Sequence, residues 1–431
     1  MSERNRELFA LIPASLLVTA GFAAIFIQRS DTLSNVSLTY GAAFLALCVA
    51  GHVVVRMTLP HADPYLFPLV ATLACFGLVV VYRIDETLAR EQAQWFVTGL
   101  LLFAATIVLL RDVSVLERYR YVIALAGIGM LILPRLPGIG SQVNGAYLGV
   151  HLGPLTFQPA EFAKIAIVIF LASYLRDTRQ VLVLGARRFM GLTIPPLKHF
   201  GPLLVIWGGS MVLLFVIRDI GSSLMFFGGF LAVLYVGTGR VSFAAVGLLL
   251  FAAGAWFLGT HIGHVHDRIE AWHHAFDPHL YNKIGGSYQV AQASFAMADG
   301  GVVGAGFGQG LISVGHTHLL PAAQTDLIYA VITNELGLAG ACGLLLVYLL
   351  FAERGFKTAM LARDSFSKLL ATGLTAVFAL QVFVIVGGVT RLIPLTGVTL
   401  PFVSYGGSSI MANFILVALL LLVSEKARRP A

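Results

Sequence analysis

Residues 241–261 read VSFAAVGLLLFAAGAWFLGTH, and Asp, Glu, Lys and Arg are absent from these 21 positions. A helix needs roughly 20 consecutive, mostly apolar residues to cross the hydrocarbon core of a bilayer. The stretch therefore predicts a membrane-spanning helix.

Stretches of the same kind recur from one end of the 431-residue chain to the other. Hydrophobic residues make up 58% of the chain and charged residues only 11%, so no water-soluble fold could bury the apolar surface. Twelve spans are predicted, at residues 8–28, 37–57, 65–82, 95–110, 119–134, 160–175, 201–217, 221–238, 241–261, 326–352, 367–388 and 408–424. The predicted fold class is an all-α polytopic integral membrane protein.

The distribution of charge indicates how the chain crosses the membrane. A formal net charge of +7 could suggest a nucleic-acid partner. If both termini are placed in the cytoplasm, however, most Lys and Arg residues fall in the cytoplasmic loops. The positive-inside rule expects this distribution for a membrane protein. We therefore predict a multi-pass inner-membrane protein with both termini in the cytoplasm and no nucleic-acid partner.

Ionisable side chains at membrane depth are costly and mark candidate functional sites. Glu161 and Lys164 lie three residues apart on one helix face, so they should pair with each other or with a substrate. A structural ion pair that locks two helices is the alternative. Asp326 stands at the start of a helix, where the helix dipole would stabilise its charge and Thr325 could be the cap. Glu335 lies about two and a half turns deeper.

Four further segments interrupt the apolar pattern. Arg218-Asp219 is interpreted as a turn held by a local charge pair. Residues 394–409 read PLTGVTLPFVSYGGSS, which predicts a re-entrant loop lining a substrate cavity, or else a plain helix-breaking connection. The outward loops 135–160 and 262–325 are rich in Gly and Pro. The longer loop is expected to be ordered and to contain interfacial helices, such as the stretch from Tyr288 to Met297.

Cysteine and histidine give weak signals for metal binding. Cys48, Cys75 and Cys342 fall within apolar stretches without metal-ligand spacing and are predicted to be small buried side chains. Six histidines crowd the start of the long outer loop, at positions 261, 264, 266, 273, 274 and 279. Their spacing matches no zinc motif, so a metal site there is not favoured.

Four separated motifs carry a resemblance to a known family. They are FQPAEFAK at 157–164, TDLIYA at 325–330, NELG at 334–337 and the run 394–409. Together with GLVVVY at 77–82 they resemble the SEDS family, which includes RodA and FtsW, over about residues 65–424. The Gln-Pro-Ala-Glu form within the first motif favours the RodA members.

The resemblance implies both an architecture and an activity. The family is built on ten helices, so residues 1–60 would be two additional N-terminal spans and residues 61–431 the SEDS-type domain with its large loop 262–325. Its members are bacterial peptidoglycan glycosyltransferases that polymerise lipid II during cell elongation or division. They are embedded in membrane lipids. Their partner is a class B penicillin-binding protein, which cross-links the glycan.

The resemblance also implies an inverting transfer, in which the 4-hydroxyl of an acceptor sugar attacks the anomeric carbon of a lipid-pyrophosphate donor and needs a base. The family places its essential Asp shortly before a Gly-Tyr-Gln element, which here reads GSYQ at 286–289. The usual Asp-Pro-x-Gly pattern is replaced by residues 281–285, so Asn282 stands at or next to the expected Asp. Since Asn cannot act as an ordinary base, Asp277, the nearest carboxylate, is predicted to be catalytic.

Other residues are assigned to substrate binding or to the shape of the cavity. This set is Glu161, Lys164, Arg268, Asn282, Gln289, Asp326, Glu335 and Ser404. Arg268 is expected to bind pyrophosphate or to anchor the loop, with a snorkelling interface arginine as the alternative. Glu335 is expected to support the cavity from deeper in the bundle. A departing pyrophosphate requires cationic or metal stabilisation, so the resemblance allows Mg²⁺ or Mn²⁺; no organic cofactor is expected.

Two other classes of function stay open. A lipid II flippase would show internal repeats with discontinuous helices that meet at the midplane, and no convincing repeat links the two halves. A scaffold or activator of the class B partner would keep the fold and lose the catalytic carboxylate. Asn282 keeps that second alternative open.

Overall fold

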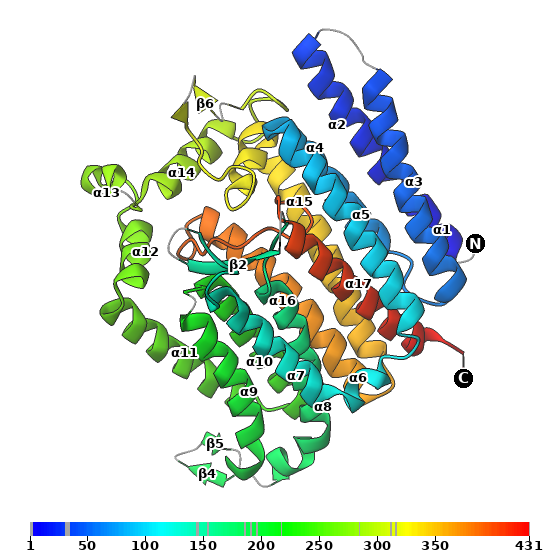
Figure 1. Cartoon of the computed structure of the whole chain (residues 1–431), viewed down its shortest axis with the longest axis vertical. Coiled ribbons are helices and arrows are strands. Elements are labelled where there is room, and N and C mark those ends of the chain that lie inside the picture. The colour runs from blue at the N-terminus through cyan, green and yellow to red at the C-terminus, as the bar shows by residue number, and fades with distance from the viewer. Residues whose placement is uncertain are drawn as a thin grey trace.

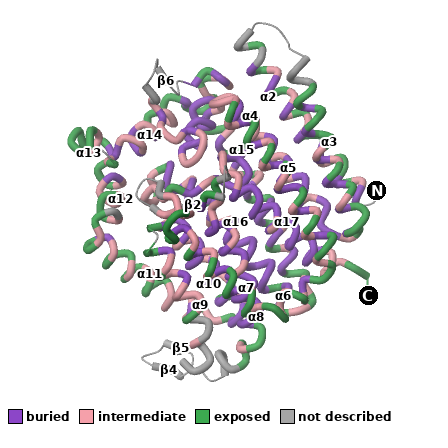
Figure 2. Tube along the Cα trace, in the orientation of Figure 1, coloured by how far each residue is buried: buried purple, intermediate pink, exposed green. Residues whose placement is uncertain are grey.

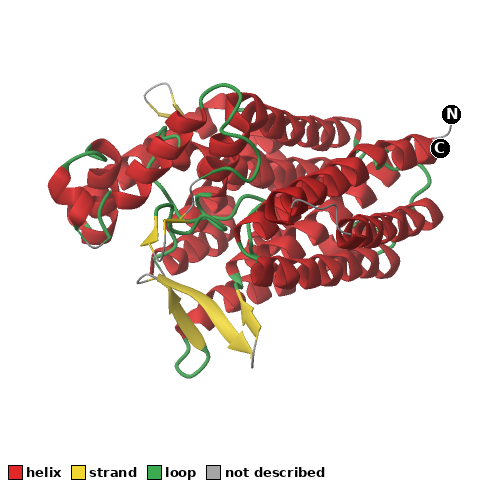
Figure 3. Ribbon diagram, turned by 90° about the horizontal axis from the view of Figure 1, so that it is seen from above, coloured by secondary structure: helices red, strands yellow, loops and turns green. Residues whose placement is uncertain are grey.

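The computed structural model of the chain describes residues 3–30, 35–143, 146–152, 155–184, 187–189, 192–194, 197–216, 218–283, 285–310, 313–314 and 317–430. Long helices run side by side in a single bundle (Figure 1). Both termini lie at one end of the bundle, and an arc of shorter helices from the long outer loop lies towards the other end (Figure 3).

All twelve predicted spans fall on helices. These are α2 (Ile12–Ser30), α3 (Asn35–Thr58), α4 (Leu66–Ile84), α5 (Glu86–Leu109), α7 (Arg120–Ile132), α8 (Ala160–Leu184), α9 (Leu197–Val216), α10 (Ile220–Thr238), α11 (Val241–His261), α15 (Ile328–Leu361), α16 (Ser365–Val389) and α17 (Gly407–Arg428). Among the described residues nine helical segments meet the length and hydropathy of a membrane span, and α7, α8 and α9 are the predicted spans that do not. The chain is a polytopic, mainly helical membrane protein.

Short elements occupy the connections. The helices are α1 (Glu3–Ala10), α6 (Ser114–Arg118), η1 (Leu133–Arg135), α12 (Gly263–His273), α13 (Pro278–Asn282) and α14 (Tyr288–Gly300). Helices α12 to α14 form the arc, and α14 confirms that the stretch from Tyr288 to Met297 is helical, while its place at the membrane interface stays a prediction. The division into residues 1–60 and 61–431 stays a prediction; α2 packs directly on α4, so the first helices are joined to the rest of the bundle.

The all-α prediction missed several small antiparallel sheets in the described part of the chain. Their strands are β1 (Gly140–Val143), β2 (Ala146–Leu152), β3 (Leu155–Phe157), β4 (Arg187–Phe189), β5 (Leu192–Ile194), β6 (Ser313–Val314) and β7 (Thr317–His318). In the first sheet β2 pairs with β1 and β3, and Val150 faces Phe157. Strand β3 ends at Phe157, and α8, which carries Glu161, begins three residues later at Ala160.

The buried centre of the bundle is formed by α17, α16 and α4 (purple in Figure 2). In the span of α17, 89% of the residues are buried, against 6% in α11, so α17 is central and α11 faces outward. A Cβ atom at Gly99 of α5 would lie 2.5 Å from Phe414 of α17. Close approach of the two helices therefore depends on the glycine, as is common in membrane bundles.

Burial of the cysteines was only partly predicted. Cys48 and Cys75 are buried as expected, but Cys342 is exposed on α15. The prediction for Cys342 was wrong because an apolar residue on the outward face of a membrane helix is covered by lipid rather than by protein. Apolar character alone cannot separate the two environments.

Helix α15 is broken by a kink at Gly337, which the sequence did not predict. The residue has φ 66° and ψ −172°, a backbone conformation that is almost restricted to glycine. The kink exposes backbone groups, which pair with the glycine-rich segment after α14: Leu338 N donates to Gly301 O and Gly306 N donates to Glu335 O. This pairing joins the outer loop to the start of α15.

Gly337→Ala should destabilise the protein, because a Cβ atom there would lie 2.4 Å from Gly304 N and 2.4 Å from Val302 O. The backbone strain alone costs on the order of 1–3 kcal/mol. The measurement is the thermal midpoint of the purified protein in detergent. Gly129→Ala is the control, since nothing lies within 4 Å of a Cβ atom at that position of α7. Equal midpoints for the two variants would contradict the account of the kink.

Candidate active site

Residues 391–406, here called the buried segment, connect α16 to α17 without regular secondary structure. Most of residues 398–404 are buried, and Phe402 has a positive φ of 63°. Irregular backbone at membrane depth is tolerated only where protein or a wet cavity satisfies its polar groups. The run 394–409 therefore contains a loop that is largely buried in protein, and whether it lines a substrate cavity stays a prediction.

Ser404 is central to how the buried segment is held. Its hydroxyl donates to Thr325 O at 2.7 Å and accepts from Leu400 N at 2.9 Å. Its carbonyl accepts from Gln92 Nε2 of α5 at 3.0 Å. Because its hydroxyl both donates and accepts, Ser404 holds the buried segment to the loop before α15.

Glu161 and Lys164 form the predicted ion pair on α8, and both side chains are almost fully buried. Lys164 Nζ also donates to Gln381 Oε1 of α16 at 2.7 Å. Gln381 Nε2 in turn donates to Thr399 O in the buried segment at 2.9 Å. The pair thus belongs to a relay of polar contacts that joins α8, α16 and the buried segment.

Arg268 reaches from α12 over the buried segment, where its Nη1 donates to Leu395 O at 3.1 Å. The negative charges of Asp326 and Asp219 both act on this guanidinium. Trp272, one turn along α12, donates its indole N–H to Arg391 O at 2.8 Å. The arc is therefore fastened to the buried segment at two points, and Arg268 anchors the loop as predicted.

Asp326 lies in the loop before α15, outside the membrane-spanning helices, and is partly buried. Burial raises the pKa of Asp326 to about 6, and the positive charge of Arg268 opposes the shift. A Cβ atom at Gly397 of the buried segment would lie 3.5 Å from Asp326 Oδ2. The predicted cap was wrong in detail: residue 327 is the N-cap of α15 without a side-chain bond, and the Thr325 hydroxyl donates to Ala322 O at 3.4 Å.

Glu335 does not support Asp326 from below, as its place in the sequence suggested. Its Oε1 pairs with Arg83 Nε of α4 at 3.2 Å, and its Oε2 accepts from Gly308 N at 2.8 Å. Arg83 also donates to Gly308 O at 2.6 Å and Gly310 O at 3.0 Å. Glu335 therefore joins α4 to the glycine-rich segment.

The loop candidates Asp277, Asn282 and Gln289 lie on the arc. Asp277 is exposed and caps α13, where its Oδ1 accepts from His279 N at 2.8 Å. Asn282 is exposed at the end of the same short helix and donates to Pro278 O at 2.9 Å. Gln289 is half-buried at the start of α14. Asp277 and Asn282 thus make hydrogen bonds at the two ends of α13. Among the described contacts, neither residue touches Arg268.

Asp277 nevertheless stays close to the fastened end of the arc. The ring of Phe276, its chain neighbour, lies 4.8 Å from the guanidinium carbon of Arg391. An exposed carboxylate at this position is open to water and to a substrate that approaches from outside.

Three functional residues were missed or misassigned from the sequence. Asp219 caps α10, where its Oδ1 accepts from Ser222 N at 2.9 Å. Its negative charge also attracts the guanidinium of Arg268. The predicted charge pair between Asp219 and Arg218 is not among the described ion pairs. Gln381 was overlooked, although an amide within the apolar run 367–388 is itself a signal. Gln92 carried no signal, because its segment precedes the predicted span at 95–110.

A divalent cation can be tested against these side chains. Among the described residues, no three His, Cys, Asp or Glu side chains gather in a way that could hold a metal ion. Mg²⁺ bound to substrate phosphates commonly takes only one or two protein carboxylates. Asp219 and Asp326 fit that second arrangement, while a cage made only of protein side chains does not fit the described part of the chain.

The Lys164→Met variant should be much less stable than the wild type, because the Glu161 carboxylate stays buried without its cation. Breaking one partner of a buried ion pair costs about 3–5 kcal/mol. Thermal unfolding in detergent measures the effect, and Glu161→Gln combined with Lys164→Met should recover most of the loss. A double variant as unstable as Lys164→Met would contradict the assignment of the ion pair.

The pKa of Asp326 predicts a pH dependence of stability. The pKa is raised from 3.8 to about 6, so the folded state binds more protons than the unfolded state between these values. Relative to Asp326→Asn, the wild type should therefore lose stability as the pH rises through about 6. Thermal midpoints of both proteins from pH 5 to pH 8 measure the difference. A difference that is constant or grows with pH would contradict the burial of Asp326.

Comparison with known proteins places these observations in a family. The family model described as cell cycle protein, for FtsW, RodA and SpoVE, matches residues 64–429. The peptidoglycan glycosyltransferase RodA of Mycobacterium tuberculosis (strain ATCC 25618 / H37Rv) is 39% identical over 443 residues, which cover 100% of this chain and 92% of that protein. The probable peptidoglycan glycosyltransferase FtsW of Geobacter metallireducens is 30% identical over 375 residues, covering 85% and 95%.

Solved structures give the same result. A chain from a peptidoglycan synthase complex that coordinates polymerization and crosslinking has a TM-score of 0.68 and 25% identity over 86% of this chain and 99% of its own. The rod shape determining protein RodA of Thermus thermophilus has a TM-score of 0.61 and 25% identity over 86% and 98%. This chain belongs to the family of the cell cycle proteins FtsW, RodA and SpoVE.

Proposed function

We propose that this chain is a peptidoglycan glycosyltransferase that polymerises lipid II into glycan strands. Relatives that cover the whole chain or most of it carry the name peptidoglycan glycosyltransferase. The site supports this reading because Arg268 belongs to the arc and hydrogen-bonds the buried segment, and the arc lies opposite the end that carries both termini (Figure 1). With both termini in the cytoplasm, that end faces outward, where glycan strands are made.

The position of Arg268 is the observation that carries the proposal. A guanidinium that is hydrogen-bonded to a buried loop and attracted by the charges of Asp326 and Asp219 is a pre-positioned cation for an anionic leaving group. Arginine binds phosphate oxygens through two parallel hydrogen bonds. Arg268 would bind the pyrophosphate of the lipid donor, and Asp219 and Asp326 would orient the guanidinium.

In the proposed reaction, the 4-hydroxyl of the acceptor sugar loses its proton to a base and attacks the anomeric carbon of the donor. The bond from that carbon to the pyrophosphate oxygen breaks, the configuration inverts, and the lipid pyrophosphate leaves. Asp277 is the proposed base, since it is an exposed carboxylate beside the fastened end of the arc. Asp326 is the second candidate, because a pKa of about 6 suits a base near neutral pH.

Two further components complete the proposal. A divalent cation, Mg²⁺ or Mn²⁺, would neutralise the pyrophosphate, with Asp219 or Asp326 as its protein ligand. A class B penicillin-binding protein would cross-link the product, since the structurally similar synthase complex coordinates polymerization with crosslinking. Neither component requires an organic cofactor.

Polymerisation of labelled lipid II by the purified protein, alone and with its class B partner, tests the proposal. Wild type should make glycan strands, and the variant that lacks the base should lose about 10²–10⁴-fold in rate. Asp277→Asn and Asp326→Asn are compared with Asn282→Asp. Arg268→Lys should also lose rate, because a lysine keeps the charge but not the paired hydrogen bonds.

The pattern of losses separates the alternatives. Loss in Asp277→Asn with activity in Asp326→Asn assigns the base to Asp277, and the reverse assigns it to Asp326. The scaffold alternative would be favoured if the wild type makes no glycan strands even with its partner while Asn282→Asp does.

A further inference from the structure

Two cavities lie along one seam of the molecule, between α15 on one side and α1, α2 and α4 on the other. The α15 residues that line them are Leu336, Gly340, Gly343, Leu344, Val347, Arg354, Lys357 and Leu361. These residues recur at intervals of three, four and seven, so they share one face of the helix. The α4 side repeats the pattern, because Tyr65, Thr72 and Phe76 follow one another at seven and four residues.

The first cavity, here called the basic cavity, lies near both termini and has a volume of about 440 Å³. Its lining contains five basic side chains, Arg6, His61, Arg354, Lys357 and Arg428, against one acidic side chain, Glu3. Loop positions on the cytoplasmic side are often basic, but here the arginines and the lysine come from three helices, α1, α15 and α17, and face one hollow.

Nearby carboxylates neutralise only part of this charge. Buried Asp63 pairs with Arg428 and lies 3.7 Å from Arg354 Nη1, and Arg354 Nε lies 3.0 Å from Glu353 Oε2, so both arginines have carboxylate partners. Within the described residues, no ion pair of Arg6 or Lys357 is found. The basic cavity therefore keeps positive charge for an anionic ligand. His61 has its own partner, since its Nδ1 lies 3.1 Å from Glu425 Oε1.

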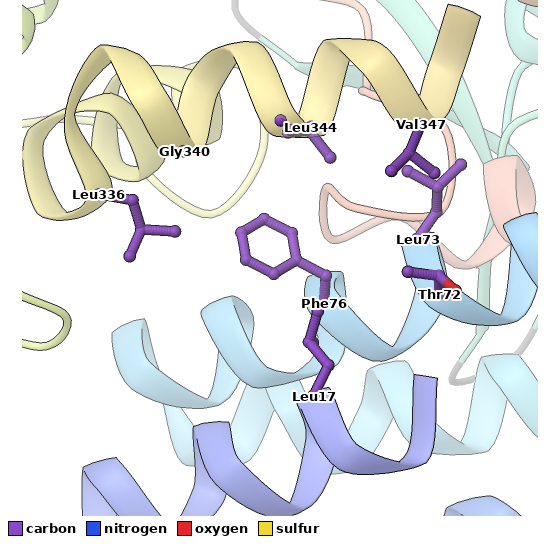
Figure 4. A pocket seen from close by; sticks show the side chains of 9 residues that line it. Leu17, Thr72, Leu73, Phe76, Leu336, Gly340, Leu344 and Val347 are labelled. Carbon is purple, nitrogen blue, oxygen red and sulfur yellow. The ribbon is translucent and has the colours of Figure 1, made fainter. Parts of the chain in front are cut away.

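The second cavity, here called the apolar cavity, has a volume of about 240 Å³ and is lined almost entirely by carbon. Figure 4 shows Leu17 of α2 and Phe76 of α4 facing Leu344 and Val347 of α15 across it. A Cβ atom at Gly343 would meet nothing within 4 Å, so the glycine leaves open space there. In a bilayer an apolar hollow of this kind suits a hydrocarbon chain.

The spacing of the two cavities matches a single lipid molecule. Leu344 and Lys357 are 13 residues apart on α15, which at 1.5 Å per residue is about 20 Å. One leaflet of a hydrocarbon core about 30 Å thick is about 15 Å deep. A lipid whose phosphate sits in the basic cavity can therefore place the end of one acyl chain in the apolar cavity.

We propose that this seam binds an anionic phospholipid of the leaflet nearest the termini, with its phosphate groups in the basic cavity and one acyl chain in the apolar cavity. The basic pocket between membrane helices provides the recognition of the headgroup. Because α1 and α2 form one wall and α15 and α17 the other, the bound lipid joins the N-terminal helices to the SEDS-type domain. This site is separate from the cavity around Arg268.

The test is binding of cardiolipin, phosphatidylcholine and inorganic phosphate to the delipidated full-length protein, measured by native mass spectrometry. Cardiolipin should bind with one molecule per chain, in preference to phosphatidylcholine. Arg6→Gln with Lys357→Gln should weaken cardiolipin binding by about thirtyfold, as expected for two lost surface cations. Arg118→Gln with Arg179→Gln is the matched control, since both arginines are exposed outside the seam and should have no effect.

A second pair of variants tests the acyl chain. Gly343→Leu fills the apolar cavity and should weaken cardiolipin binding by about tenfold, the equivalent of losing contact with two or so methylene groups. Gly254→Leu on α11 is its control, because a Cβ atom there also meets nothing within 4 Å. If Gly343→Leu fails to fold, the charge variants still decide the headgroup.

Two results would overturn the proposal. An equal loss in the Arg118 and Arg179 control would mean that cardiolipin binds by general surface charge. Competition by inorganic phosphate, together with unchanged cardiolipin binding in Gly343→Leu, would mean that the basic cavity takes free phosphate and that the lipid chain is not recognised.

Discussion

The structure depends on satisfying the backbone of residues 391–406, the buried segment, away from water. Bilayer and protein interiors offer no solvent partners, so each exposed carbonyl or amide there needs a side chain or backbone group. Side chains from separate helices provide them: Gln92, Gln381 and Tyr348 donate to the carbonyls of residues 404, 399 and 401. The helices of the bundle are thus positioned around one irregular strip of chain.

The same constraint explains how the candidate active site is organised. Arg268 adds its own hydrogen bond to the buried segment, which fixes the arc of outer helices over Asp326 and Asp219. The Glu161–Lys164 pair reaches the segment through Gln381. Charged groups that would be costly alone are therefore held by contacts that also build the cavity, and a rigid polar environment of this kind favours electrostatic stabilisation of a leaving group.

The helices and the ion pair on α8 could be predicted from sequence, because apolar length and a three-residue spacing are local properties. The roles of Glu335 and Ser404 could not, since their partners are distant in the chain: Arg83 lies in α4 and Thr325 precedes α15. The kink at Gly337 could not be predicted either, because it depends on the pairing of α15 with the distant glycine-rich segment. Cys342 shows the same limit for burial, because a lipid-facing residue and a core residue are equally apolar.

Amide hydrogen exchange over residues 398–406 tests the central claim most directly. Leu400, Ser404 and Tyr405 donate their amides within the protein, so the wild-type segment should exchange as slowly as the flanking helices. Gln381→Leu should accelerate exchange across the segment by freeing Thr399 O and Lys164. Fast exchange in the wild type, or exchange unchanged by Gln381→Leu, would contradict the claim that these side chains hold the buried segment in place.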